Sequence, residues 1–243
     1  MISSKQNSLI KEIRSFKDKK FRDKQGVFIV EGIKPIKEAI KLGIAIREIV
    51  CTEKAFSQFT GCNLRVEVVE EEIFKYISEE KTPQGALAVA FKRENQLVAP
   101  NGSCLLLDGV SDPTNVGAII RTAAASGYND VYMTPTCADP YSQKSVRCSM
   151  SGIFHVNVMR AELDELLRVI NLPICVADMD GENIFSIKKP SKVCLVIGNE
   201  GKGVSQVVKD KAQLTISIPM ENDMESLNAS VSAGILMYAL KEF

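Results

Sequence analysis

An asparagine, a glycine and an arginine stand at the start of a predicted helix, directly after a short apolar run typical of a buried strand (104–107). Arg121 lies on the helix face opposite the apolar stripe, and Gly117, one turn before it, would let another backbone approach closely. Asn115 suits the N-cap of this helix, and Gly127 suits the residue just past its end. Strand, loop and helix together place polar groups at the carboxyl edge of an α/β sheet. The segment could therefore cradle a nucleotide phosphate, although the arginine argues for a different use.

A second predicted strand runs into a loop that holds three glycines and the carboxylate Glu200. The glycine spacing fits neither the Gly-x-Gly-x-x-Gly fingerprint nor the P-loop, so a tight turn alone would explain it. A carboxylate in such a loop could orient an arginine through a bidentate pair. Two roles for Arg121 stay open at this point: action on a substrate, or a structural salt bridge to Glu200.

A third segment combines the last predicted strand, an acidic turn and a final helix over 226–241. Ser226, Leu227 and Asn228 open this helix, which carries no charged residue before Lys241. A helix that is apolar all round must be buried on both sides. One side can face the core of the domain. The other side faces either a partner subunit or further core of the same chain.

The composition narrows the classes of protein. Thirty basic and thirty acidic residues balance, so a nucleic-acid partner would have to meet a local basic patch. The seven cysteines include no Cys-x-x-Cys pair and mostly lie in apolar runs, which is typical of buried thiols in a reducing compartment. With a single histidine, a metal site is not expected. The chain shows no signal peptide and no apolar run of the ~20 residues that a membrane helix needs, so we expect a cytoplasmic protein without membrane contact.

The first part of the chain predicts a small α/β domain over residues 1–95. Residues 1–24 carry eight basic and three acidic side chains, and the apolar residues keep helical spacing. This basic amphipathic helix is either a solvated surface or a contact for a phosphate backbone. Strands and helices then alternate, with strands at 27–30, 46–51, 65–69 and 85–91 and helices at 35–42 and 71–77. A polar stretch with proline and glycine predicts a linker over 96–103.

The second domain, 104–243, also alternates between strands and helices. This alternation predicts a mainly parallel sheet covered on both faces. We expect strands at 104–108, 130–133, 154–158, 173–177, 193–197 and 214–218, and helices at 115–126, 142–149, 161–170, 204–210 and 226–241.

The three segments resemble the motifs of the SpoU/TrmH family of RNA ribose 2′-O-methyltransferases, within the SPOUT class. The first carries Asn-x-Gly-x-x-x-Arg, the second Gly-x-Glu-x-x-Gly, and the third Ile-Pro-Met followed by Ser-Leu-Asn. All three occur in order and at strand ends, which makes the combination specific. Phe-Ile-Val-Glu-Gly at 28–32 and Thr-Pro-Gln-Gly at 82–85 resemble the RNA-binding domain that many members carry first. The resemblance covers nearly the whole chain.

The resemblance implies a fold and a cofactor. The fold would be a SPOUT-type α/β sheet with a C-terminal trefoil knot, preceded by a small ribosomal-protein-like α/β/α RNA-binding domain. True knots are rare, so no periodicity could predict one. The cofactor would be S-adenosylmethionine, held largely by backbone groups. By position, the matching cofactor residues are Gly198, Asn199, Ile218, Met220 and Leu227.

The resemblance also implies site residues and partners. The catalytic residues would be Arg121, Glu200, Ser226 and Asn228, and a homodimer would form through the final helix. Ribosomal RNA is favoured as the substrate, with transfer RNA as the alternative. The residues expected to face RNA are Asn115, Gly117, Arg22 and Arg147.

The chemistry requires the ribose hydroxyl to lose its proton while it attacks in line, with water excluded. Positioning of the reactants can supply ~7–11 kcal/mol of the barrier reduction. An arginine is not deprotonated in proteins, so we favour Arg121 as an electrostatic stabiliser of the developing alkoxide over Arg121 as a base. Two other classes stay as alternatives: a non-catalytic RNA-binding protein with the same fold, and a dinucleotide-dependent oxidoreductase, which lacks the proper glycine fingerprint.

Overall fold

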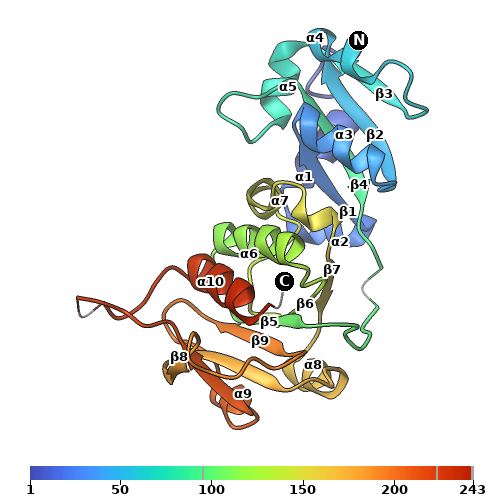
Figure 1. The fold of residues 1–243 in the computed structure, drawn as a ribbon. Helices are drawn as coiled ribbons and strands as arrows, with labels where there is room; N and C mark the ends of the chain where they lie inside the picture. Colours follow the sequence, from blue (N-terminus) through green and yellow to red (C-terminus); the bar gives the residue numbers. More distant parts are fainter. Residues whose placement is uncertain (95, 223, 242–243) are drawn as a thin grey trace.

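Two sheets form the framework of the computed structural model, which describes residues 1–94, 96–222 and 224–241 (Figure 1). The expected boundary at residue 95 lies outside the described residues. The N-terminal sheet has the order β1-β4-β2-β3, in which β2 and β3 are parallel and the other neighbours are antiparallel. Its elements are α1 (Ser8–Ser15), α2 (Lys19–Gln25), β1 (Val27–Glu31), α3 (Ile33–Lys41), β2 (Ile46–Thr52), α4 (Glu53–Phe56), η1 (Ser57–Phe59), β3 (Val66–Val69), α5 (Glu71–Ile77) and β4 (Ala86–Phe91).

The predicted single helix at the N-terminus is two short helices. Asn7 caps α1 by accepting a hydrogen bond from the backbone of Leu9, and Asp18 caps α2 in the same way from Lys20. An aspartate side chain that binds nearby backbone N–H groups favours a new helix start over continuation of the previous helix. The break lets α1 pack Ile10 and Ile13 against one side of the N-terminal sheet.

The C-terminal sheet has six strands in the order β10-β8-β9-β5-β6-β7, and every neighbouring pair is parallel. The prediction of a parallel sheet covered on both faces is therefore confirmed. Its elements are β5 (Cys104–Asp108), α6 (Pro113–Ser126), β6 (Asp130–Met133), α7 (Gln143–Ser149), η2 (Gly152–Phe154), β7 (Asn157–Arg160), α8 (Leu163–Val169), β8 (Ile174–Asn183), β9 (Cys194–Gly198), α9 (Gln206–Lys209), β10 (Leu214–Ser217) and α10 (Ala229–Leu240).

Each face of this sheet has its own core. Residues of α6 and α10 pack on the face that carries Leu105 and Leu107, whereas residues of α8 and α9 pack on the face that carries Leu106 and Val196. Successive strand residues point to opposite faces, so the uninterrupted apolar run of β5 serves both cores. The sheet thereby fixes the loops at its carboxyl edge.

Several predicted boundaries differ from the structure: the strand expected at 173–177 continues to Asn183, and three further differences have a clear local cause. Helix α6 begins at Pro113, because Asp112 caps it by accepting from the backbone of Thr114 at 2.7 Å and proline suits the first helical turn. Asn115 is thus inside the helix. Helix α10 begins at Ala229, three residues later than expected, with Asn228 as its cap. The strand expected at 154–158 is β7, displaced toward the C-terminus because η2 occupies 152–154.

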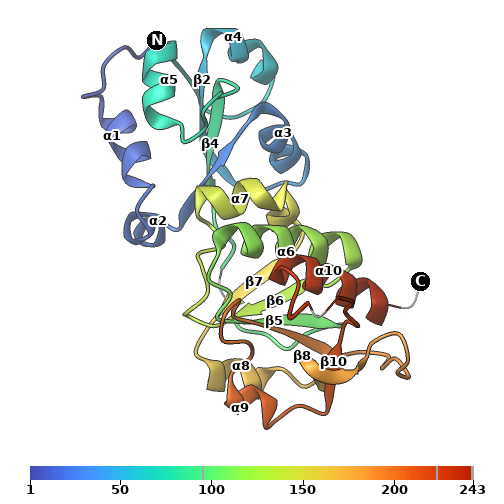
Figure 2. The same ribbon diagram turned by 90° about the vertical axis from the view of Figure 1, so that its left-hand side faces the viewer.

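The two domains are in contact over more than their connecting chain. Helix α7 lies between α6 and the N-terminal sheet (Figure 2). One continuous apolar cluster runs from Phe28 and Val30 of β1 through Val146 of α7 to α6. The two domains are therefore held together by packing of their side chains as well as by the linker expected at 96–103.

Among the described residues, no helix is long and apolar enough to cross a membrane.

Candidate active site

The loops that carry the first two motifs meet because their strands are neighbours. In the register of β5 and β9, Asp108 lies beside Gly198, so both chains leave the sheet at one edge. Asp108 also ties the second loop down, since its carboxylate accepts a hydrogen bond from the backbone of Ser205 at 2.8 Å. The sequence analysis singled out neither Asp108 nor Ser205. The only available signal was that Asp108 ends a strand.

Glu200 binds the loop in front of α6. Its carboxylate accepts hydrogen bonds from the Ser111 hydroxyl (2.9 Å), from the backbone of Ser111 and Asp112 (3.1 and 3.2 Å) and from Asn115 Nδ2 (2.9 Å). Partial burial opposes ionisation, but the hydrogen bonds from Asn115 and from the backbone outweigh it and lower the pKa of Glu200 to about 2. The carboxylate is therefore a fixed negative charge at neutral pH. It connects the second motif to the first.

Asn115 connects the same pair of motifs to the third. It is only 6% exposed, its Nδ2 donates to Glu200, and its Oδ1 accepts from Asn228 Nδ2 at 3.0 Å. Asn228 in turn caps α10, with its Oδ1 accepting from the backbone of Ser230 and Val231. The expectation that Asn115 faces RNA does not fit this burial. Its amide joins the three motifs into one hydrogen-bonded chain.

Gly198 and Asn199 close the second loop tightly. The backbone of Asn199 exchanges two hydrogen bonds with Gly203, and Asn199 Nδ2 donates to the Gly109 carbonyl at 2.8 Å. A methyl group on Gly198 would overlap the Gly203 and Val204 backbone, so only glycine fits there. Gly201, in the same loop, has its nearest neighbouring atom 3.8 Å from the position of a Cβ.

Gly198→Ala is expected to destabilise the protein by about 1–3 kcal/mol, because the overlap with backbone forces the loop to shift. The same change at Gly201 meets no such obstacle and serves as the matched control. Urea denaturation of both variants checks this prediction. Equal stabilities of the two variants would contradict the close approach.

Arg121 is exposed on α6 and makes no hydrogen bond or ion pair with any described residue. The proposed salt bridge between Arg121 and Glu200, and with it the orientation of Arg121 by Glu200, is wrong for this chain because Glu200 is occupied by other donors. The guanidinium is therefore available for an anion. Only the backbone of Arg121 is confined, since a methyl group on Gly152 of η2 would come within 2.8 Å of its Cα.

Gly117 is buried at the crossing of α6 and α7. A Cβ there would overlap the Ser145 carbonyl oxygen and lie close to Cys148. The expected close approach of another backbone is confirmed, and that backbone is α7. Gly117 is therefore not exposed to RNA as expected, and its role is helix packing.

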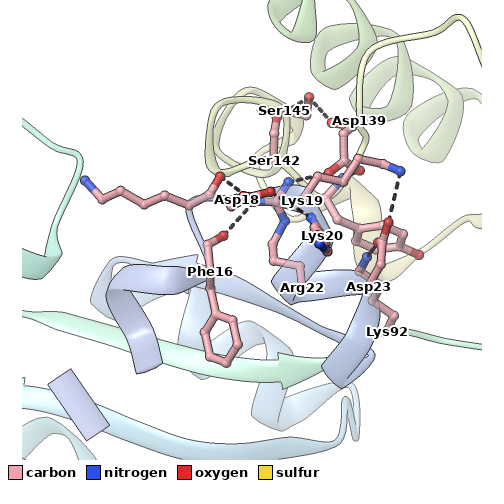
Figure 3. Close-up of polar contacts among 12 residues, drawn as sticks. Phe16, Asp18, Lys19, Lys20, Arg22, Asp23, Lys92, Asp139, Ser142 and Ser145 are labelled. Atoms are coloured by element: carbon pink, nitrogen blue, oxygen red, sulfur yellow. Dashed lines mark hydrogen bonds and ion pairs between the residues drawn. The ribbon is translucent and has the colours of Figure 1, made fainter. Parts of the chain in front are cut away.

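Arg22 is also not available to RNA. Its side chain is 3% exposed, and its guanidinium donates to the Phe16 and Lys17 carbonyls and to Asp139 of the other domain (Figure 3). Sequence reasoning missed this because Asp139 is 117 residues away along the chain. Arg147 of α7 is about half exposed and forms an ion pair with Glu80 at 2.9 Å.

The segments expected to hold the cofactor contain backbone N–H groups that have no hydrogen-bond acceptor among the described residues. The backbone N–H groups of Ile218, Met220 and Leu227 donate no hydrogen bond within the described part of the chain. Ile218 packs on the core, whereas Met220 is partly exposed. Ser226 is exposed. Backbone N–H groups without an internal partner fit a nucleoside that is recognised mainly by the main chain, as expected for S-adenosylmethionine.

A basic cavity lies at the junction of the two domains. Its volume is about 240 Å³, and both domains line it. Arg93 in its wall donates to the Phe154 and Val156 carbonyls and to Asn157, so its charge meets no carboxylate among the described residues. The lining residues are Lys19, Asp23, Lys92, Arg93, Asp139, Pro140, Tyr141, Val158 and Arg160.

Comparison with known proteins agrees with this geometry. Residues 102–238 match the SpoU rRNA Methylase family, and residues 7–88 match the MRM3-like substrate binding domain. A 23S rRNA (guanosine(2553)-2′-O)-methyltransferase, RlmP of Bacillus subtilis, is 32% identical over 99% of this chain and 98% of its own length.

Solved structures match over the same extent. An AdoMet-bound rRNA methyltransferase from Sinorhizobium meliloti superimposes with a TM-score of 0.88 at 27% identity, covering 98% of this chain and 96% of that chain. A putative RNA methyltransferase of the TrmH family from Porphyromonas gingivalis gives a TM-score of 0.85 at 32% identity, covering 99% and 98%. The chain therefore belongs to the SpoU rRNA methylase family, which confirms the assignment made from the three motifs. It carries an MRM3-like substrate-binding domain at its N-terminus.

Proposed function

We propose that this chain transfers a methyl group from S-adenosylmethionine to a ribose 2′-hydroxyl of ribosomal RNA. The observation that carries the proposal is Arg121, which is exposed and without a partner among the described residues, on the same helix whose Asn115 links Glu200 to Asn228. The RlmP relative, named for 2′-O-methylation of 23S rRNA, supports ribosomal RNA as the substrate. Transfer RNA stays the alternative.

Different residues of the site would bind the cofactor, stabilise the developing charge and hold the ribose. Bound S-adenosylmethionine supplies the methyl group and a sulfonium leaving group, and the backbone of Gly198, Ile218 and Leu227, with Asn199 and Met220 nearby, would hold it. Arg121 stabilises the negative charge that develops on the ribose 2′-oxygen during its attack; the hydroxyl proton is released to solvent, and the sulfonium sulfur of the methyl donor would leave as a neutral thioether. Ser226 is free to hold the ribose.

Glu200 and Asn228 act on the shape of the site, because their side chains are occupied by backbone groups and by Asn115. We therefore assign them a positioning role. Their part in catalysis is to keep the loops of the three motifs together, so that alignment of the reactants is set before the RNA binds.

Incubation of the protein with isotope-labelled S-adenosylmethionine and ribosomal RNA, followed by nuclease digestion and mass spectrometry, tests the proposal. We expect one 2′-O-methylated nucleoside in ribosomal RNA and none in transfer RNA. Calorimetry should show binding of S-adenosylmethionine and none of NAD. Binding of RNA without methyl transfer would favour a non-catalytic RNA-binding protein instead.

We further propose that RNA phosphates enter the basic cavity at the domain junction. Lys19→Gln and Arg93→Gln should each weaken RNA binding and reduce the slope of log K against log salt by about 0.7–0.9, the value for one lost phosphate contact. Lys211→Gln, near α9 and away from the junction, is the control. Unchanged slopes in both cavity variants would remove this part of the proposal. Arg147 remains an expected RNA contact, and its ion pair with Glu80 would have to break before its guanidinium could bind a phosphate.

A homodimer through α10 is part of the same proposal. The helix buries Ala233, Leu236 and Met237, whereas Val231 and Tyr238 on its other side are 49% and 44% exposed. The alternative of burial on both sides within one chain thus finds no support in these exposures. A monomeric mass in sedimentation at micromolar concentration would refute the dimer.

The remaining expectations also stay proposals. They are the trefoil knot in the C-terminal domain, action in the cytoplasm, and the division of the chain into 1–95, the linker 96–103 and 104–243. They are supported by the motifs and by the family. Among the described residues, no group of metal-binding side chains lies together.

A further inference from the structure

The contact between the domains is built around a buried ion pair. Arg22 of α2 reaches across to Asp139, with its Nη2 2.5 Å from the carboxylate Oδ2 (Figure 3). The Arg22 and Asp139 side chains are 3% and 12% exposed. The second guanidinium nitrogen donates to two carbonyls of the turn between α1 and α2, which fixes the direction of the arginine. Loss of one member of a buried pair leaves the other charge buried and uncompensated, so the docked arrangement depends on both residues.

Asp139 is also the residue that organises the start of α7. Its second carboxylate oxygen accepts from the backbone of Tyr141 at 3.0 Å, and its carbonyl accepts from the Ser145 hydroxyl at 2.8 Å. Further contacts hold the same helix to the N-terminal domain. Arg147 pairs with Glu80, and the ring of Phe28 in β1 lies 5.1 Å from that of Tyr141.

Helix α7 and the turn after it support the helix that carries Arg121. Ser145 packs against Gly117 of α6, and Gly152 packs against the backbone of Arg121 itself. The N-terminal domain also holds this turn directly. Arg93 Nη2 donates to the Phe154 carbonyl at 2.6 Å, and the ring of Phe28 lies 6.4 Å from that of Phe154.

The turn needs this support. Met150 and Ser151 have φ angles of 45° and 70°, in the left-handed region that residues other than glycine rarely adopt. Such a conformation persists only where the surrounding structure holds it. Here α6 lies on one side of the turn and the N-terminal domain on the other.

We propose that the docked N-terminal domain positions Arg121 for methyl transfer, and that Arg22 is a positioning residue of the reaction. Docking through Arg22, Phe28 and Arg93 fixes α7 and the turn 150–154, and these fix the backbone of Arg121. The domain thus sets the rate at which bound RNA is methylated, in addition to holding the RNA. This inference rests on the proposed function.

Two variants of Arg22 and one of Gly152 test it. Arg22→Met removes the charge and the donors, and Arg22→Lys keeps the charge but loses the forked geometry. Gly152→Ala pushes on Arg121 from the catalytic domain alone. Arg47→Met is the control, because Arg47 pairs with Glu12 and Glu48 inside the N-terminal domain.

With saturating RNA, we expect kcat to fall about 10- to 100-fold in Arg22→Met and Gly152→Ala, and less in Arg22→Lys, since small displacements of a catalytic group have effects of this size. The affinity for S-adenosylmethionine, measured by calorimetry, should be unchanged. Hydrogen exchange followed by mass spectrometry should become faster over 113–126 and 150–154 in Arg22→Met, but not in Arg47→Met.

A raised KM for RNA with unchanged kcat, and faster exchange confined to residues 1–94, would overturn the inference, because the domain would then only hold the RNA. Wild-type kcat in Gly152→Ala would overturn it as well. If Arg22→Met loses its far-ultraviolet circular dichroism, Arg22→Lys decides by the same measurements. Absence of methylation by the wild-type protein would refute the proposed function, whereas the exchange measurement would still decide the coupling.

Discussion

Arg121→Ala is expected to lower kcat by about 10²–10³-fold, the loss seen when one preorganised electrostatic group is removed from an active site. The reason is the state of Arg121 in the structure. Its side chain is exposed and has no partner among the described residues, while its backbone is held by Gly152. Because the guanidinium makes no hydrogen bond or ion pair with the described residues, its loss should not disturb folding.

Measurement of kcat, of S-adenosylmethionine affinity and of the urea midpoint on the same preparation separates these effects. We expect only kcat to change. Arg168→Ala, an exposed arginine of α8 on the other face of the sheet, is the matched control. A fall in the urea midpoint for Arg121→Ala alone would show that the arginine is structural.

The pH dependence of kcat separates the two chemical roles of Arg121. A stabiliser of negative charge keeps part of its effect as lysine, so Arg121→Lys should retain more activity than Arg121→Ala at every pH. A base would instead give a single ionisation near neutral pH that disappears in Arg121→Lys but persists in Ser226→Ala. That result would contradict the electrostatic role.

The outline of the site could be predicted because each motif directly follows a strand. The apolar runs of β5 and β9 predicted the two strands, and parallel neighbours bring their carboxyl ends to one edge. The spacing of Gly117 and Arg121 predicted the crossing of another backbone. Its identity, α7, could not be predicted, since no local pattern encodes which helix packs at a glycine.

The sequence alone could not predict which groups the charged side chains bind in the folded protein. Glu200 binds backbone N–H groups of a loop, and every residue carries such a group, so the sequence has no signal for it. Arg22 stands in a basic stretch that predicts a nucleic-acid contact, whereas its buried ion pair depends on the docking of two domains. The sequence shows the opposite charges of Arg121 and Glu200, which is why an ion pair between them was among the expectations. It does not show the hydrogen-bond donors that compete with Arg121 for Glu200.

Glu200→Gln is expected to destabilise the protein by about 1–2 kcal/mol at pH 7, the range for hydrogen bonds to a charged group at a partly exposed site. An amide keeps one acceptor oxygen, but its nitrogen cannot accept from Ser111, Asp112 or Asn115. The loop before α6 and the cap of α10 should both loosen, so we also expect weaker S-adenosylmethionine binding and lower kcat/KM. Calorimetry and steady-state kinetics check these two effects.

The pH dependence of this loss follows from the pKa of Glu200. The pKa is about 2 in the folded protein and near 4.5 without these contacts, so ionised Glu200 contributes stability above pH 4.5. This contribution decreases as the pH falls from 4.5 through 2, where the folded protein also takes up the proton. The difference in urea stability between wild type and Glu200→Gln should therefore be largest at pH 7 and shrink toward pH 3. Glu182→Gln, an exposed carboxylate of β8, should show no such trend, and a difference that stays constant from pH 7 to pH 3 would show that the charge of Glu200 does not hold the motifs together.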